Sequence, residues 1–143
     1  MNDQSEPTTM WFDRRLVLRQ SPIQGIGTFA THDIAAGELL ILVTGGIVYT
    51  TEDWQTGRVQ LEAEMYNEGN IAKDLCIATP KSIHYYVNHS CDANVVDLSR
   101  SGRAIQFVAA RTIHAGEELT ADYYDETSLK QCNCQSPKCR WAK

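Results

Sequence analysis

The chain has 143 residues, with 13 Lys and Arg against 18 Asp and Glu, a formal net charge of -5 and 43% hydrophobic residues. This length suits one domain with its own core. The acidic balance disfavours direct nucleic-acid binding, which depends on Lys and Arg neutralising phosphates, and favours a basic protein or peptide partner. No apolar run reaches the roughly 20 residues that cross a bilayer, and the polar start is not a secretory signal. We therefore expect an intracellular protein with no membrane partner, nuclear in a eukaryote and cytoplasmic in a bacterium.

Short segments with strand character begin soon after the N-terminus. Residues 1–13 are polar and are expected to form a frayed tail, whereas residues 15–19 alternate in polarity like a first strand. Residues 39–43 form an apolar run of strand length. Gly45 and Gly46 are expected to reverse the chain into another strand at 47–49, which predicts a hairpin.

One helical segment interrupts the strands. Thr50 or Thr51 offers an N-cap, and Glu52 and Asp53 lie in the first turn, so a helical insertion is expected at about 51–67. Further strands are expected at 75–78, 95–98, 104–109 and 119–124. Many short strands with one helical segment indicate a β-rich α+β domain.

Five cysteines are present, and three form a Cys-x-Cys-x4-Cys tail at Cys132, Cys134 and Cys139. Reduced thiols at this spacing indicate a metal site before they indicate a disulfide. Zinc takes four tetrahedral ligands, so the tail lacks one. The candidates are Cys91, Cys76 or a histidine. Cys91 is preferred because it follows a turn-forming sequence, whereas Cys76 sits among apolar neighbours like a small core residue.

Two shorter motifs are ambiguous by themselves. Residues 86–91 end in an amide, an imidazole, a hydroxyl and a thiol after an apolar lead-in, which is typical of a site at the edge of a core and also of a plain turn. Gly25 and Gly27 let the backbone approach a ligand closely or simply turn the chain. They are not a dinucleotide fingerprint, because the third glycine and the following helix are missing.

Taken together, five motifs resemble a SET-domain protein lysine methyltransferase with a post-SET zinc segment. They are residues 25–30, 34–38, 88–94, 116–123 and the three-cysteine tail. Each motif is weak alone, whereas five in the same order and spacing are specific. The resemblance implies a SET domain at 14–126 and a post-SET segment at 127–143. It also implies a fold of several small curved sheets with a C-terminal pseudoknot.

The resemblance further implies S-adenosylmethionine as cofactor, a structural zinc ion, and transfer of a methyl group to a lysine in a basic tail, a histone tail being one candidate. Tyr123 would be the catalytic tyrosine, and Tyr86, Ala121 and Tyr124 would line the substrate channel. The residues against the cofactor would be Gly25, Ile26, Gly27, Thr28, Phe29, Asn88, His89 and Trp141. The zinc ligands would be Cys91, Cys132, Cys134 and Cys139.

The sequence departs from the family pattern at two places. Val43 to Gly46 stand where the family has a tyrosine and Gly-Glu, so one wall of the lysine channel is absent. Four tyrosines could take its place: Tyr49, Tyr85, Tyr86 and Tyr124. Ala121 stands where a larger aromatic usually limits methylation, so products beyond monomethyl-lysine are expected. These departures leave an alternative open, a non-catalytic SET-like zinc module that binds a basic peptide, while the acidity disfavours a zinc-stabilised DNA-binding domain.

Overall fold

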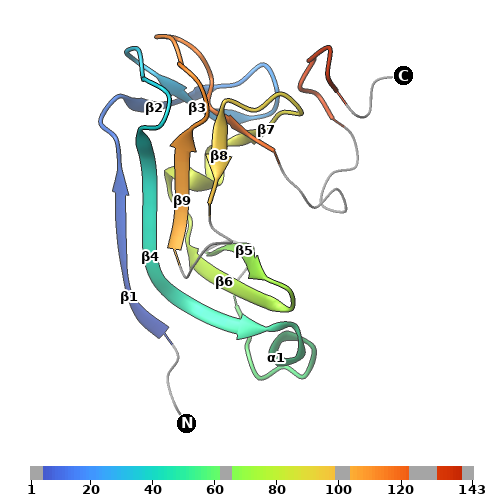
Figure 1. Cartoon of the computed structure of the whole chain (residues 1–143). Coiled ribbons are helices and arrows are strands. Elements are labelled where there is room, and N and C mark those ends of the chain that lie inside the picture. The colour runs from blue at the N-terminus through green and yellow to red at the C-terminus, as the bar shows by residue number, and fades with distance from the viewer. Residues whose placement is uncertain (1–4, 62–65, 99–103, 123–131, 140–143) are drawn as a thin grey trace.

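Strands dominate the computed structural model, which describes residues 5–61, 66–98, 104–122 and 132–139 (Figure 1). The strands are β1 (Ser5–Phe12), β2 (Leu16–Gln20), β3 (Ile26–Ala30), β4 (Leu39–Thr50), β5 (Tyr66–Ala72), β6 (Leu75–Pro80), β7 (Asn88–His89), β8 (Val95–Asp97), β9 (Ala104–Ala109) and β10 (Thr120–Ala121). The helices are α1 (Thr51–Gln55) and the 3-10 helix η1 (Ile83–Tyr86). Within these ranges, no helix is long and apolar enough to cross a membrane.

The strands form one larger sheet and two small ones. The larger sheet has the order β5-β6-β4-β9-β8, with β1 paired to β4 beside this path. β2 pairs with β3, and β7 pairs with β10, in separate two-stranded sheets. This arrangement of small sheets confirms the β-rich fold that the sequence predicts.

The predicted hairpin at residues 39–49 is wrong, because this segment forms one long strand, β4. Leu39–Thr50 is one strand, in which Gly45 and Gly46 adopt φ values of 83° and 92°. Its first half pairs with β9 and its second half pairs with β6, so the two halves never meet each other. The glycines therefore bend the strand rather than reverse it, and the curve is visible in Figure 1.

The N-terminal segment is also corrected. Residues 5–12, expected to fray, form β1 along β4, with Phe12 opposite Ile41 and Trp11 opposite Leu42. Met10 packs against the hydrophobic core. A polar composition does not prevent such pairing, because an edge strand is held mainly by backbone hydrogen bonds that any residue can make.

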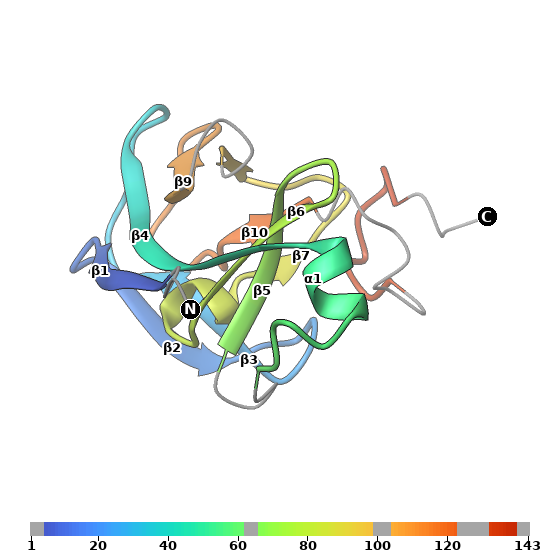
Figure 2. The same cartoon turned by 90° about the horizontal axis from the view of Figure 1, so that it is seen from below.

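The helix is shorter than the expected insertion at 51–67. The N-cap prediction is confirmed, since the Thr50 hydroxyl accepts from the Asp53 N–H at 3.0 Å and the Asp53 carboxylate accepts from the Thr50 N–H at 2.9 Å. The helix nevertheless ends at Gln55, because Gly57 takes a left-handed φ of 74° that no helix continues. In Figure 2, α1 lies at the far end of β4.

Two similar turns, at 34–38 and 113–117, face each other across the fold. The backbone N–H of Ile34 donates to the carbonyl of Ile113 at 2.8 Å, and the N–H of Ile113 donates back at 2.9 Å. Both side chains are fully buried. Gly37 and Gly116 share a φ of 89°, so the likeness in sequence is also a likeness in backbone shape. This contact fixes where the chain enters the segment that leads to β10.

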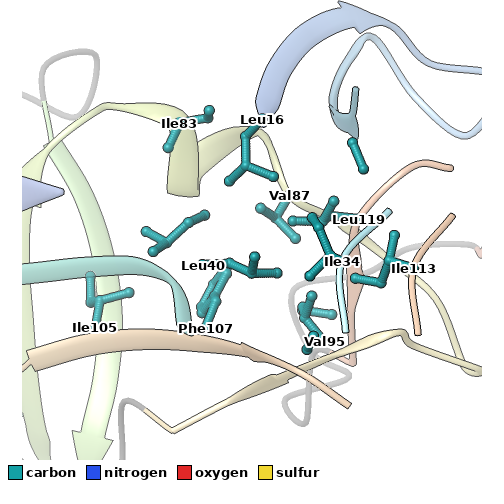
Figure 3. Close-up of a cluster of buried hydrophobic side chains, with 14 of the residues drawn as sticks. Leu16, Ile34, Leu40, Ile83, Val87, Val95, Ile105, Phe107, Ile113 and Leu119 are labelled. Carbon is teal, nitrogen blue, oxygen red and sulfur yellow. The ribbon is translucent and has the colours of Figure 1, made fainter. Parts of the chain in front are cut away.

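The hydrophobic core lies between the larger sheet, the β2–β3 pair and η1 (Figure 3). Its members come from all along the chain: Leu16, Ala30, Ile34, Leu40, Ile41, Val43, Ile83, Val87, Val95, Ile105, Phe107, Ala109, Ile113, Leu119 and Ala121. Val87 and Leu119 immediately precede β7 and β10, so the core holds both of these strands at its edge.

The bend in β4 makes Gly46→Ala a test of this fold. A Cβ at Gly46 would stand 2.6 Å from the carbonyl oxygen of Ala78, in addition to the strain of its positive φ. Gly57→Ala is the matched control, because its φ is also positive but its nearest neighbour is a flexible side-chain atom at 3.7 Å. Conformation alone costs about 1–2 kcal/mol at each site. Urea unfolding should show a clearly larger decrease in the free energy of unfolding for Gly46→Ala than for Gly57→Ala. Equal decreases would contradict the close packing of Gly46 against Ala78 at the bend.

Candidate functional site

The centre of the site is the parallel pair of β7 and β10. Asn88 lies opposite Thr120, and His89 lies opposite Ala121. The N–H of Ser90 extends the pair by donating to the carbonyl of Ala121 at 3.0 Å. Two segments that lie far apart in the chain therefore form one unit.

Asn94 fastens the same two segments with its side chain. Its amide nitrogen donates to the carbonyl of Glu118 at 2.8 Å, and its amide oxygen accepts from the N–H of Thr120 at 2.8 Å. The residue is only 3% exposed, so these bonds replace those that water would otherwise make. The sequence motif contains Asn94, but its spacing alone gave no reason to assign it a role.

The side chain of Asn88 joins β7 to the glycine turn. Its Nδ2 lies 3.1 Å from both the hydroxyl of Ser21 and the carbonyl of Gln24, and 2.8 Å from a carboxylate oxygen of Glu118. All these contacts use the amide nitrogen. The amide oxygen is thus left outside this network, on a residue that is only half-buried.

Glu118 is another site residue that sequence reasoning missed. Its two carboxylate oxygens each lie 2.8 Å from the Ser21 hydroxyl, and one also accepts from Asn88. A Cβ on Gly27 would overlap the same carboxylate, so glycine is needed there for space. Gly25 has nothing within 4 Å of such an atom and is needed for its φ of 49° instead. The second Glu of a Glu-Glu pair was the available signal, but no pattern indicated which one faces inward.

The side chains of the glycine turn differ in their exposure and in their contacts. Ile26 is exposed, whereas Thr28 is fully buried. The Thr28 hydroxyl lies 3.3 Å from the carbonyl of Ile83 and 3.2 Å from that of Tyr86, so it anchors η1 to β3. The Thr28 side chain is thus engaged with η1, and the prediction that Thr28 lies against the cofactor stays a prediction. Phe29 is half-buried and bridges to Glu118 through the backbone.

Four thiols converge beside β7. The sulfur atoms of Cys91, Cys132, Cys134 and Cys139 all lie within 4.8 Å of one another, and those of Cys91 and Cys132 are 3.9 Å apart. Tetrahedral zinc with bonds of about 2.3 Å separates its sulfur ligands by about 3.8 Å. The donor set and its spacing therefore fit zinc. Cys76, the other candidate, lies on β6 opposite Tyr49.

The metal-free thiols would not all ionise together. Burial raises the pKa of the Cys132 thiol to about 12. Burial would also raise the pKa of Cys134, but hydrogen bonds from the backbone N–H groups of Cys91 and Ser136 and from neighbouring thiols lower it to about 6. A thiolate is the form that binds metal, so Cys134 is the thiol that ionises most readily. A bound dication would favour ionisation of the other three thiols as well.

The imidazole of His89 lies between the cysteine cluster and β10. It is 5% exposed. Its Nε2 lies 3.4 Å from the sulfur of Cys91, and its Nδ1 lies 3.7 Å from a carboxylate oxygen of Asp122. The ring therefore faces the thiols and Asp122, which leaves the backbone as the part of His89 able to contact a cofactor.

Two adjoining clefts separate the turn at Pro22 and Ile23 from the cysteine tail. The first, of about 310 Å³, is lined by Ser90, Asn94, Glu118 and Cys134 together with that turn. The second, of about 490 Å³, extends along the tail past Asn133 and Cys139. Their volumes lie in the range of small-molecule sites. The clefts place a ligand-sized space between the thiol cluster and residues Pro22 and Ile23, which precede the glycine turn.

Several expected site residues lie outside the described part of the chain. These are Tyr123, Tyr124 and Trp141. Of the other channel residues, Ala121 is buried in β10 and Tyr86 is half-buried at the end of η1. The ring of Tyr86 meets that of Tyr85 edge to face at a centroid distance of 5.1 Å.

Val43, which stands where the family has a tyrosine, is 1% exposed within the hydrophobic core. Among the candidate substitutes, Tyr49 is buried and its ring centroid lies 6.2 Å from that of Trp54, at the α1 end of β4. Tyr85 is 44% exposed. Tyr49 is committed to packing, so of the three candidates in the described part of the chain the two tyrosines of η1 are the accessible ones.

The contact between Gly27 and Glu118 can be tested by a double-mutant cycle. Gly27→Ala should lower the free energy of unfolding, because its methyl group displaces the Glu118 carboxylate from Ser21 and Asn88. Glu118→Ala should then cost less in the Gly27→Ala background than in the wild type, since its bonds are already broken. Gly25→Ala is the control, and it should show no such coupling. Additive losses for Gly27 and Glu118 would argue against the contact.

Comparison with known proteins agrees with this geometry. The SET-domain family matches residues 25–124. Histone-lysine N-methyltransferase trr of Drosophila melanogaster is 34% identical over 137 residues, which cover 86% of this chain and 6% of that protein. Histone-lysine N-methyltransferase TRX1 of Oryza sativa subsp. japonica is 34% identical over 140 residues, covering 90% and 14%. An H3 lysine-4 specific histone-lysine N-methyltransferase of Mycosarcoma maydis is 32% identical over 145 residues, covering 89% and 10%. The chain thus spans a small part of each relative, and within that part it belongs to the SET-domain family.

Proposed function

We propose that this domain is an S-adenosylmethionine-dependent protein lysine N-methyltransferase. The observation that carries the proposal is the network of Asn88, Ser21 and Glu118, which holds the glycine turn and β7 together at the edge of a ligand-sized cleft. Membership of the SET-domain family supports it, as do relatives named histone-lysine N-methyltransferases.

The chemistry explains the residue types. Bound S-adenosylmethionine supplies an activated methyl group on a positively charged sulfonium. A lysine amine can accept that group only as the neutral base, although its usual pKa is about 10.4. An apolar channel lowers this pKa by desolvation, and a nearby positive charge lowers it further. In this account Tyr123 orients the amine through its hydroxyl and is not a strong base.

We also propose that the four thiols hold a structural zinc ion. Cys91 belongs to the turn after β7, and the other three belong to the tail, so one ion would tie the tail to the edge of the site. Structural zinc of this kind contributes on the order of 10 kcal/mol to binding and folding. Its role here is to place the tail across the cleft.

The proposed substrate is a lysine in a basic protein tail, and a histone tail is the leading candidate. The formal charge of -5 supports this choice, and four thiolates with one dication would make the chain more negative still. The named activity of the relatives on histones extends the proposal to a nuclear setting. No direct contact with nucleic acid is proposed.

The proposal predicts a specific failure in Tyr123→Phe. Loss of the hydroxyl should leave the affinity for S-adenosylmethionine, measured by calorimetry, close to that of the wild type. Methyl transfer to histone-tail peptides should fall strongly, because the amine loses its orienting group. Unchanged turnover would remove Tyr123 from the transfer centre. Zinc-loaded wild-type protein that binds the peptides but does not bind S-adenosylmethionine would instead support the non-catalytic module.

The small side chain of Ala121 predicts the extent of methylation. Wild-type enzyme should methylate a good peptide substrate beyond monomethyl-lysine. The side chain of Ala121 is small, so it leaves room in the channel for a lysine amine that already carries a methyl group. Ala121→Phe should shift the product toward monomethyl-lysine, and mass spectrometry of the peptide reads both results. A wild-type product limited to monomethyl-lysine would contradict the prediction. Thermal unfolding of Ala121→Phe serves as the control, since position 121 is only 3% exposed.

A further inference from the structure

The most informative contact not used so far is the position of the His89 ring. Its two nitrogens face different parts of the site, Nε2 toward the sulfur of Cys91 at 3.4 Å and Nδ1 toward the carboxylate of Asp122 at 3.7 Å. The ring is almost fully buried, so neither contact is an incidental surface contact. Both partners are half-buried.

The chemistry of the cysteine cluster determines which way the Cys91 contact runs. A thiol that binds zinc does so as the thiolate, which has no proton to donate. The hydrogen in the Nε2–Sγ contact must then come from the ring, so Nε2 is the donor. A donor to a ligand atom fixes the orientation of that ligand and stabilises its charged form.

The second nitrogen, Nδ1, faces the segment that follows β10. A neutral imidazole has a single N–H, so a ring that donates from Nε2 to the thiolate also donates toward the Asp122 carboxylate only as the doubly protonated imidazolium. Asp122 follows Ala121, the residue that pairs with His89 across β7 and β10, and Asp122 immediately precedes Tyr123. One imidazole therefore connects a proposed metal ligand with the chain segment that enters the proposed transfer centre.

We propose that His89 is a positioning residue that holds the Cys91 thiolate for zinc and, through Asp122, couples the metal site to the segment at Tyr123. The inference rests on the proposed zinc site. Asp122 acts through His89 in this account, as an outer partner that keeps the ring turned toward Cys91. The backbone pairing of His89 with β10 is independent of the ring and is expected to survive its replacement.

The test measures zinc affinity in the full chain by competition with a chromophoric chelator. His89→Phe keeps a ring of similar volume but removes both nitrogens, and it should weaken zinc binding about 10- to 100-fold. His89→Gln places an amide N–H near the position of Nε2 and should recover most of the affinity. The cobalt-substituted protein gives a second readout, because loss of the donor to Cys91 should shift its sulfur-to-metal charge-transfer bands in His89→Phe.

His84→Phe is the matched control. His84 is also buried, at 4% exposed, but its Nε2 lies 3.1 Å from the hydroxyl of Thr79, and it is not part of the thiol cluster. Its replacement should alter thermal stability and leave zinc affinity unchanged. Equal zinc affinities in wild type and His89→Phe would overturn the inference while leaving the zinc site intact. Wild-type protein that binds no zinc would overturn both.

Asp122→Asn tests the coupling. It should weaken zinc binding less than His89→Phe does, because it removes only the outer partner. In the His89→Phe background the same change should have no further effect on zinc affinity, since the ring that transmits it is gone. An equal effect of Asp122→Asn in both backgrounds would show that Asp122 does not act through His89.

Discussion

The site depends on the parallel pairing of Asn88–His89 with Thr120–Ala121. Parallel strands cannot be joined by a tight turn, so the residues between β7 and β10 form a long crossover connection. The core holds it from behind through Val87 and Leu119, and the buried amide of Asn94 fastens it in front. The proposed cofactor site and the proposed metal site both adjoin this strand pair.

The strand pair of β7 and β10 adjoins two groups of contacts, a hydrogen-bond network and a cluster of thiols. The network of Glu118, Ser21 and Asn88 is formed from polar groups that are present in the chain itself. The thiol cluster is different, because burial opposes ionisation of Cys132 and a dication is needed to gather four thiolates. The glycine turn is thus held by groups of the chain itself, whereas the placement of the tail would depend on metal. A domain with this division would bind its cofactor only once the tail is closed.

The sequence could predict the parts of the site that depend on chemistry with few alternatives. Three cysteines at close spacing require a fourth ligand, and the preference for Cys91 over Cys76 matches the observed gathering of the four sulfurs. Order and spacing of the motifs also led to the SET-domain family, which the comparisons confirm. Glu118 could not be identified, because its role arises from Ser21, which lies 97 residues away in the chain.

The errors in the predicted fold share a physical cause. Gly45 and Gly46 favour positive φ, but whether they bend or reverse the chain depends on the partners available to each half of β4, which are β9 and β6. The prediction of a frayed N-terminal segment is wrong for the same reason, since β1 forms by pairing with β4, which lies about 30 residues further along the sequence. Backbone pairing between distant segments leaves little trace in local composition.

The central claim, that closure of the cysteine tail by zinc completes the cofactor site, is tested most directly by calorimetric titration of S-adenosylmethionine into zinc-loaded and zinc-depleted protein. We expect clear binding to the zinc-loaded form and binding that is lost or strongly weakened after zinc is removed, with recovery when zinc is returned. Equal affinity in the two forms would contradict it.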